Sequence, residues 1–116
     1  MSILEKIDDK EITILGEVWT IKVVELIDGG TDNYGCCDIT SQVIKIRKIL
    51  EHTDFDSLEN CYKQTIRHEI IHAFFYESGL DNCSDASGPW AINEEMVDWF
   101  AIQGPKIFKV WKDLNI

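Results

Sequence analysis

The chain is poor in basic residues: Lys and Arg together number 11 against 21 Asp and Glu, which gives a net charge of −10 at pH 7. Nucleic-acid-binding proteins need a basic face for their phosphate contacts, so this composition argues against DNA or RNA as a partner. Long apolar runs are also missing, because no stretch approaches the ~20 residues that cross a membrane. The N-terminal run Met-Ser-Ile-Leu-Glu-Lys-Ile-Asp-Asp carries acids where a signal peptide has its apolar region. We therefore expect a cytoplasmic protein that binds neither nucleic acid nor membrane.

The four cysteines do not form a metal-binding or redox motif. Cys36 and Cys37 are adjacent, while Cys61 and Cys83 lie elsewhere in the chain, and no C-x-x-C spacing occurs. Small thiols, buried or in loops of a reducing compartment, are the simpler interpretation. Internal repeats and low-complexity linkers are absent as well. A length of 116 residues suffices for one hydrophobic core but not for two, so we expect a single domain over residues 1–116.

The most informative pattern is the pentad His68-Glu69-Ile70-Ile71-His72, an H-E-x-x-H run. Two histidines four residues apart on a helix lie on one face, with Cβ atoms about 5–6 Å apart, so both imidazoles can bind one Zn²⁺. Glu69 is rotated from His68 by roughly a quarter turn, which places its carboxylate beside the metal and within reach of a bound water. A lone histidine in an apolar helix is usually a hydrogen-bonded core residue, so the surroundings of the pentad decide between the two interpretations.

The pentad lies inside a predicted helix. Asp56-Ser57-Leu58-Glu59 resembles a capping box, with an acceptor at the N-cap and a carboxylate three residues later. Ser78-Gly79 ends the helix, because left-handed backbone costs glycine little. Between these ends, apolar residues recur at steps of three and four, as in a buried helical stripe: Leu58, Cys61, Tyr62, Ile66, Ile70 and Phe74.

A second helix is expected over Trp90–Ile102, entered through Ser87-Gly88-Pro89 and closed by Gly104-Pro105. Glu94 and Asp98 stand at i and i+4 on one face of it, where like charges repel by roughly 0.2–0.5 kcal/mol. A cation opposite that face removes the repulsion. Two His and one Glu with an open fourth position are a known ligand set for catalytic zinc.

The two segments together resemble the gluzincins, the thermolysin-like metallopeptidases. The run Ala91–Asp98 is similar to the N-E-x-x-x-D helix of that family, and Thr65–Phe74 is similar to its active-site helix. The resemblance implies a zincin-like fold, with Glu94 rather than Glu95 as the third zinc ligand. It also implies that Asp98 orients a ligand histidine. The short length, and Ile-His-Ala-Phe followed by Glu-Ser-Gly-Leu, resemble small phage or prophage metallopeptidases, the minimal gluzincins.

The resemblance covers about residues 57–104 and departs from the family in one respect. Thermolysin-like enzymes carry a further domain whose histidine and tyrosine stabilise the transition state, and no such domain fits in this chain. Tyr34, Tyr62 and Tyr76 are candidates for that support, and the sequence does not choose among them. His52 matches no motif position, and we interpret it as a loop residue.

Ahead of the helices the sequence predicts a β-sheet. Ile12 and Ile14 alternate with polar residues, Gly16-Glu17 offers a tight turn, and Trp19, Ile21 and Val23 alternate again. A turn-rich loop follows over residues 28–33. Residues Cys37–Thr40 and Val43–Arg47 could form a hairpin about Ser41-Gln42, with Ile44 and Ile46 inward.

The expected fold class is α+β and zincin-like: a small twisted sheet packed on the H-E-x-x-H helix, on the second, Glu-bearing helix and on a short C-terminal helix over residues 105–114. In zincins an edge strand of the sheet holds the substrate extended above the metal. Our choice for that strand is Val43–Arg47, which would bind a peptide or protein substrate by β-augmentation.

The leading hypothesis is a zinc-dependent peptidase. Zn²⁺ held by His68, His72 and Glu94 would lower the pKa of its water to about 7. Glu69 would act as general base. The alternative is a non-catalytic zinc-binding regulatory or interaction module with a vestigial site, although such a module has no need of Glu69. A metal-free helical core is the third interpretation, and it leaves two buried imidazoles in need of other partners. Neither the substrate nor the oligomeric state follows from the sequence.

Overall fold

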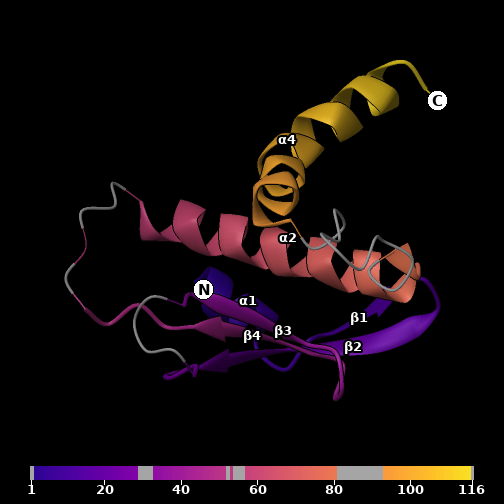
Figure 1. The fold of residues 1–116 in the computed structure, drawn as a ribbon. Coiled ribbons are helices and arrows are strands. Elements are labelled where there is room, and N and C mark those ends of the chain that lie inside the picture. The colour runs from indigo at the N-terminus through magenta and orange to yellow at the C-terminus, as the bar shows by residue number, and fades with distance from the viewer. Residues whose placement is uncertain (1, 29–32, 52, 54–56, 81–92, 116) are drawn as a thin grey trace.

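A helix crosses one face of a four-stranded mixed sheet, and a second long helix packs on the side of that helix away from the sheet (Figure 1). This computed structural model describes residues 2–28, 33–51, 53, 57–80 and 93–115. The expected α+β class is therefore confirmed. In chain order the elements are α1 (Ile3–Ile7), β1 (Glu11–Ile14), β2 (Glu17–Val24), β3 (Gly35–Asp38), β4 (Val43–Arg47), α2 (Leu58–Glu77) and α4 (Glu94–Asp113).

Two tight turns build the sheet. Leu15 and Gly16 both have positive φ, 50° and 89°, which matches the type I′ geometry that joins two twisted antiparallel strands, here β1 and β2. The predicted hairpin about Ser41-Gln42 is also confirmed, although β3 begins and ends two residues earlier than expected. The Asp38 carboxylate accepts hydrogen bonds from the backbone N–H and the hydroxyl of Thr40, at 3.1 and 2.7 Å, and so stabilises that turn.

The order of strands across the sheet is β1-β2-β4-β3. β4 pairs parallel with β2 and antiparallel with β3, so it lies inside the sheet. The prediction that Val43–Arg47 is an edge strand is therefore wrong. Its Ile44 and Ile46 side chains are 0% exposed, as suits a strand flanked on both sides. The edges of the sheet are β1 and β3.

The core lies between the sheet and α2. Trp19 and Ile21 from β2 and the two isoleucines of β4 point to the same face, since side chains alternate along a strand. Ile66 and Ala73 of α2 pack against them. Each fully buried side chain of this size contributes about 1.5–3 kcal/mol. The indole N–H of Trp19 also donates to Glu77 Oε1 at 2.9 Å, which ties the last turn of α2 to the sheet.

α4 is one continuous helix through Gly104 and Pro105, so the prediction of two helices that meet at this pair is wrong. Pro105 lacks the N–H that would bond to the Ala101 carbonyl. Arg67 of α2 donates to this carbonyl instead, through Nε at 2.7 Å, so the helix continues without an unsatisfied buried acceptor. Asn93 caps the start of α4, because its Oδ1 accepts from Met96 N–H at 3.0 Å. Trp90–Ile92, where we expected this helix to begin, lie outside the described residues.

The short helix α1 has no counterpart among the predicted elements. Its Ile3, Leu4 and Ile7 pack against the core, and Ser2 caps it by accepting from Glu5 N–H at 3.2 Å. Among the described residues, no helix is both long enough and apolar enough to cross a membrane.

Candidate metal centre

α2 places both histidines of the pentad on the side that faces α4. Ser57 caps the helix, with its hydroxyl accepting from Asn60 N–H at 3.2 Å, one residue later than the sequence indicated. Gly79 follows the last turn with a φ of 83°, the left-handed conformation expected of it. The face of α2 toward the sheet carries the buried Glu69, while His68 and His72 lie half-buried on the neighbouring face.

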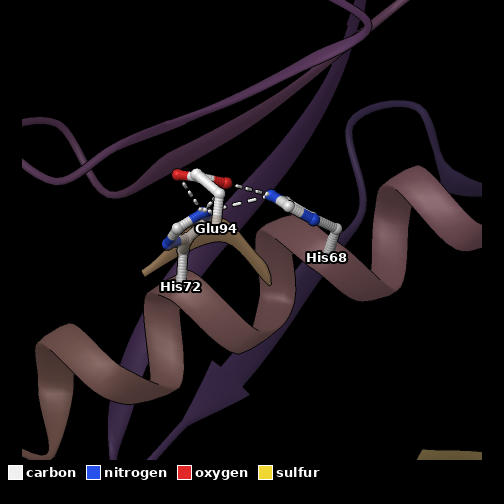
Figure 2. Close-up of side chains that lie close together, drawn as sticks. All are labelled: His68, His72 and Glu94. Carbon is white, nitrogen blue, oxygen red and sulfur yellow. Dashed lines mark hydrogen bonds and ion pairs between the residues drawn. The ribbon is translucent and has the colours of Figure 1, made fainter. Parts of the chain in front are cut away.

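One atom each of His68, His72 and Glu94 converge, with all three atoms within 4.8 Å of one another. His68 Nε2 lies 2.9 Å from Glu94 Oε2 and 3.2 Å from His72 Nε2, and the distance from His72 Nε2 to Glu94 is 3.3 Å (Figure 2). The two histidines come from consecutive turns of α2 and the glutamate from the first turn of α4. The structure therefore brings together the three residues that the sequence predicted as metal ligands.

These distances fit a tetrahedral cation. Metal–ligand bonds of about 2.0–2.2 Å in a tetrahedron separate the ligand atoms by roughly 3.3–3.5 Å, close to the values observed. Without a positive charge between them, two imidazole nitrogens and a carboxylate oxygen would present lone pairs to one another. A proton can bridge only one pair of these atoms, whereas a single metal ion satisfies all three. The donor set therefore fits Zn²⁺.

Asp98 selects the tautomer of His68. Nδ1–H of His68 donates to Asp98 Oδ1 at 2.6 Å, one turn of α4 after Glu94. With the proton held on Nδ1, the lone pair of Nε2 is directed at the cluster. Asp98 therefore lies where its predicted orienting role requires. The i, i+4 spacing puts the candidate ligand Glu94 and the carboxylate of Asp98 on one face of α4.

Glu69 lies between the cluster and the edge strand β3. Its side chain is buried, with Oε1 4.0 Å from His68 Nε2. Burial raises the pKa of Glu69 to about 7 from an ordinary value near 4.5, and the negative charges of Glu94 and Asp98 add to this rise. The positive charge of a bound metal would act in the opposite sense. A carboxylate that titrates near neutral pH beside a candidate metal site is suited to general acid–base chemistry.

Gly35 in β3 makes room for Glu69. A Cβ atom at this position would lie 2.7 Å from Thr65 Cγ2 and 2.9 Å from Glu69 Cγ, both closer than real Cβ contacts. Only glycine therefore lets the backbone of β3 approach α2 this closely. The sequence analysis missed Gly35, because a single glycine after a loop carries no sign of the helix it will contact.

A cleft of about 1240 Å³ opens between β3 and α2 and reaches the cluster. The candidate ligands, Glu69 and Asp98 lie at one part of its wall. Elsewhere its lining includes Leu26, Tyr34, Cys36, Lys45, Asn60 and Gln64. The site is thus accessible to a ligand much larger than water.

The three tyrosines considered from the sequence have different surroundings. The hydroxyl of Tyr62 accepts from Ile49 N–H at 2.9 Å, and the ring of Tyr76 packs edge-on against Trp19 at 6.5 Å, so both have structural roles. Tyr34 lines the cleft, with the guanidinium of Arg47 5.2 Å above its ring. His52 and Cys83 lie outside the described residues. Cys36 and Cys61 are free thiols, and Glu95 is exposed and outside the cluster.

Comparisons of this chain with protein-family models, with curated proteins and with solved structures found no match.

Proposed function

We propose that this chain is a zinc-dependent peptidase. The observation that supports the proposal is the convergence of His68, His72 and Glu94 at the wall of an open cleft, with the buried carboxylate of Glu69 beside them. The resemblance to the gluzincins assigns the same residues to the same roles. A purely structural metal site would have no use for Glu69, whose burial costs free energy whenever the carboxylate is ionised.

In this mechanism Glu69 transfers protons. It takes a proton from the attacking water as that water adds to the scissile carbonyl, and then delivers it to the leaving amine nitrogen as the C–N bond breaks. Asp98 holds His68 in the tautomer that binds metal. When bound, Zn²⁺ would polarise the carbonyl and lower the pKa of the water to about 7.

The edge strand β3 replaces Val43–Arg47 as the proposed site for the peptide backbone. Arg47 N–H donates to the Tyr34 carbonyl at 2.8 Å, so the next residue, Gly35, directs its N–H and C=O away from β4 toward the edge. A peptide that pairs with this edge would run along the cleft above Glu69. Tyr34, beside Gly35, becomes our candidate for stabilising the transition-state oxyanion.

The test has two stages. Zinc per chain is measured by elemental analysis on protein purified without chelator or metal-affinity tag, with His72→Ala as control. Hydrolysis of a peptide library is then compared for wild type and Glu69→Gln. About one zinc in wild type, little in His72→Ala, and about a 10²–10⁴-fold loss of hydrolysis in Glu69→Gln are expected. Zinc binding without hydrolysis in wild type would indicate a non-catalytic zinc module, and no zinc would refute both functions.

A further inference from the structure

One ridge of α2 carries both candidate histidine ligands and two amide side chains. Its members follow one another at steps of four residues: Asn60, Gln64, His68 and His72. All four line the cleft, and the two amide residues are exposed. α4 packs across the middle of α2, to one side of the first turns of that helix (Figure 1). The amide end of the ridge is therefore open to a ligand that lies in the cleft.

The two amides can bind a polypeptide backbone. The backbone N–H of Asn60 donates to Ser57, but neither the Asn60 nor the Gln64 side chain has a hydrogen-bond partner in the part of the chain that the structure describes. Each side-chain amide offers both a carbonyl oxygen and N–H donors, as a peptide group requires. One step of the ridge rises about 6 Å along the helix, close to the roughly 6.6 Å between alternate residues of an extended chain. The amides thus match the backbone groups along one edge of an extended peptide.

β3 leaves a need for such partners. The strand begins at Gly35, which lies beside Thr65 and Glu69 of α2, just after Gln64. A peptide that pairs with the edge of β3 therefore passes the start of the strand as it continues toward Asn60. Its backbone groups then require other donors and acceptors, and the amide end of the ridge lines the same stretch of the cleft.

The direction of β3 indicates which part of a peptide reaches the amides. β3 runs in the same direction as α2, because its first residue, Gly35, lies beside Thr65, whereas Gln42 in the following turn donates from Nε2 to Glu77 Oε1 at 3.1 Å. Antiparallel pairing is slightly more stable than parallel pairing. A peptide paired with β3 in this way runs from the last turns of α2 toward its first turns. Residues on the C-terminal side of the scissile bond, which leave with the amine, then lie beside the amides.

We propose that Asn60 and Gln64 bind the backbone of a polypeptide substrate on the leaving-amine side of the scissile bond, independently of its sequence. This inference rests on the proposed peptidase function and specifies its substrate class. The substrates are extended polypeptides with several residues after the cleaved bond, rather than dipeptides or single amides. Asn60 precedes His68 by a rise of about 12 Å, which an extended chain covers in roughly four residues.

Two series of peptide hydroxamates of increasing length, built from alternating Ala and Ser, test the proposal by calorimetric binding to the zinc-loaded protein. A hydroxamate at the N-terminal end holds the peptide on the leaving-amine side of the metal, and one at the C-terminal end holds it on the other side. In the first series, affinity should rise about two- to tenfold for each residue that gains a hydrogen bond. The rise should level off after roughly four residues, where the chain has passed Asn60.

The double variant Asn60→Ala/Gln64→Ala should lose most of this gain in the first series. It should bind the second series, which pairs with β3, as wild type does. Both substitutions favour helix at exposed positions, so the fold is kept. Lys63→Ala is the matched control, because Lys63 is exposed in the same turn of α2 but lies about 100° from Gln64 around the helix axis. Lys63→Ala should bind both series as wild type does.

An unchanged gain with length in the double variant would overturn the proposal. A loss in the second series instead of the first would also overturn it, because the peptide would then run in the opposite direction. Binding does not require hydrolysis, so the two proposals can fail separately. The expected length dependence in a protein that hydrolyses no peptide would refute the peptidase and support the role of the amides. Hydrolysis without the length dependence would refute only the role of the amides, and a chain that binds no zinc would refute both.

Discussion

Nε of Arg67 donates to the backbone carbonyl of Ala101 at 2.7 Å, and this carbonyl is the one that Pro105 leaves without a helical donor. Arg67 immediately precedes His68 in α2, while Ala101 lies one turn beyond Asp98 in α4. One hydrogen bond thus connects the two helices that carry the candidate metal ligands. It also explains why a Gly-Pro pair fails to end α4.

We expect Arg67→Met to lower the free energy of unfolding of the metal-free protein by about 1–3 kcal/mol, because the buried Ala101 carbonyl loses its donor. In a Pro105→Ala background the restored N–H serves that carbonyl, so the same substitution should cost less. Urea unfolding of the four proteins measures this coupling. Equal losses in both backgrounds would show that Arg67 acts through some other contact.

Asp98→Asn should weaken zinc binding about 10–100-fold, since a neutral amide accepts a weaker hydrogen bond from Nδ1–H of His68 and can instead donate its N–H to Nδ1, which favours the other tautomer. Glu95→Gln removes a carboxylate that lies in the first turn of α4 but outside the cluster. The zinc affinity of this variant should therefore match that of wild type. Competition with a chromogenic chelator measures both. Equal affinity of Asp98→Asn and wild type would contradict the orienting role.

Gly35→Ala should impair hydrolysis more than it impairs zinc binding. Its Cβ would lie 2.7 Å from Thr65 and 2.9 Å from Glu69, so either β3 or the Glu69 side chain has to move. Overpacking of this kind costs about 1–3 kcal/mol of stability. The zinc content and kcat/KM of purified Gly35→Ala, compared with wild type, test the expectation. Full activity would mean that the strand yields without moving the carboxylate.

Glu69 should make the stability of the metal-free protein depend on pH. Its pKa is raised by burial to about 7 in the folded state, from an ordinary value near 4.5. The folded state therefore holds a proton that the unfolded chain releases above about pH 4.5. Stability from this group is fully present below that pH and is lost as pH rises through 7, by on the order of 3 kcal/mol.

Glu69→Gln, which stays neutral, should lack this pH dependence and should exceed the metal-free wild type in stability at pH 8. Below pH 4.5 the carboxyl of Glu69 is neutral in both the folded and the unfolded state, so ionisation of Glu69 should contribute little to the difference in stability between the two proteins. Urea unfolding across pH 4–8 in the presence of chelator measures it. Parallel pH profiles for the two proteins would show that the carboxylate is already solvated.

Local patterns in the sequence predicted much of the candidate site. The spacing of His68 and His72 on a capped helix requires only helical geometry, as does the spacing of Glu94 and Asp98. Which carboxylate completes the cluster, Glu94 or Glu95, followed only from the resemblance to the gluzincins. The distances in the structure now distinguish them, because Glu94 lies 2.9 Å from His68 while Glu95 remains outside the cluster.

The errors arose where non-local contacts override local preferences. Gly104-Pro105 is a strong local stop signal, and the donor that cancels it comes from Arg67, 34 residues earlier. Local patterns also did not predict the order of the strands, because β2 pairs in parallel with β4 and these two strands are separated in sequence by β3. The alternation of Ile44 and Ile46 identified a strand but not its neighbours.

β3 pairs with a single strand, β4, and its other side borders the cleft. A strand held on one side only can detach in a local opening that leaves the remaining three-stranded sheet and its core intact. Amide hydrogens of β3 should then exchange with solvent faster than those of β4, which is held on both sides. The wall of the cleft nearest Glu69 is thereby also an edge of the sheet that can yield to an incoming chain.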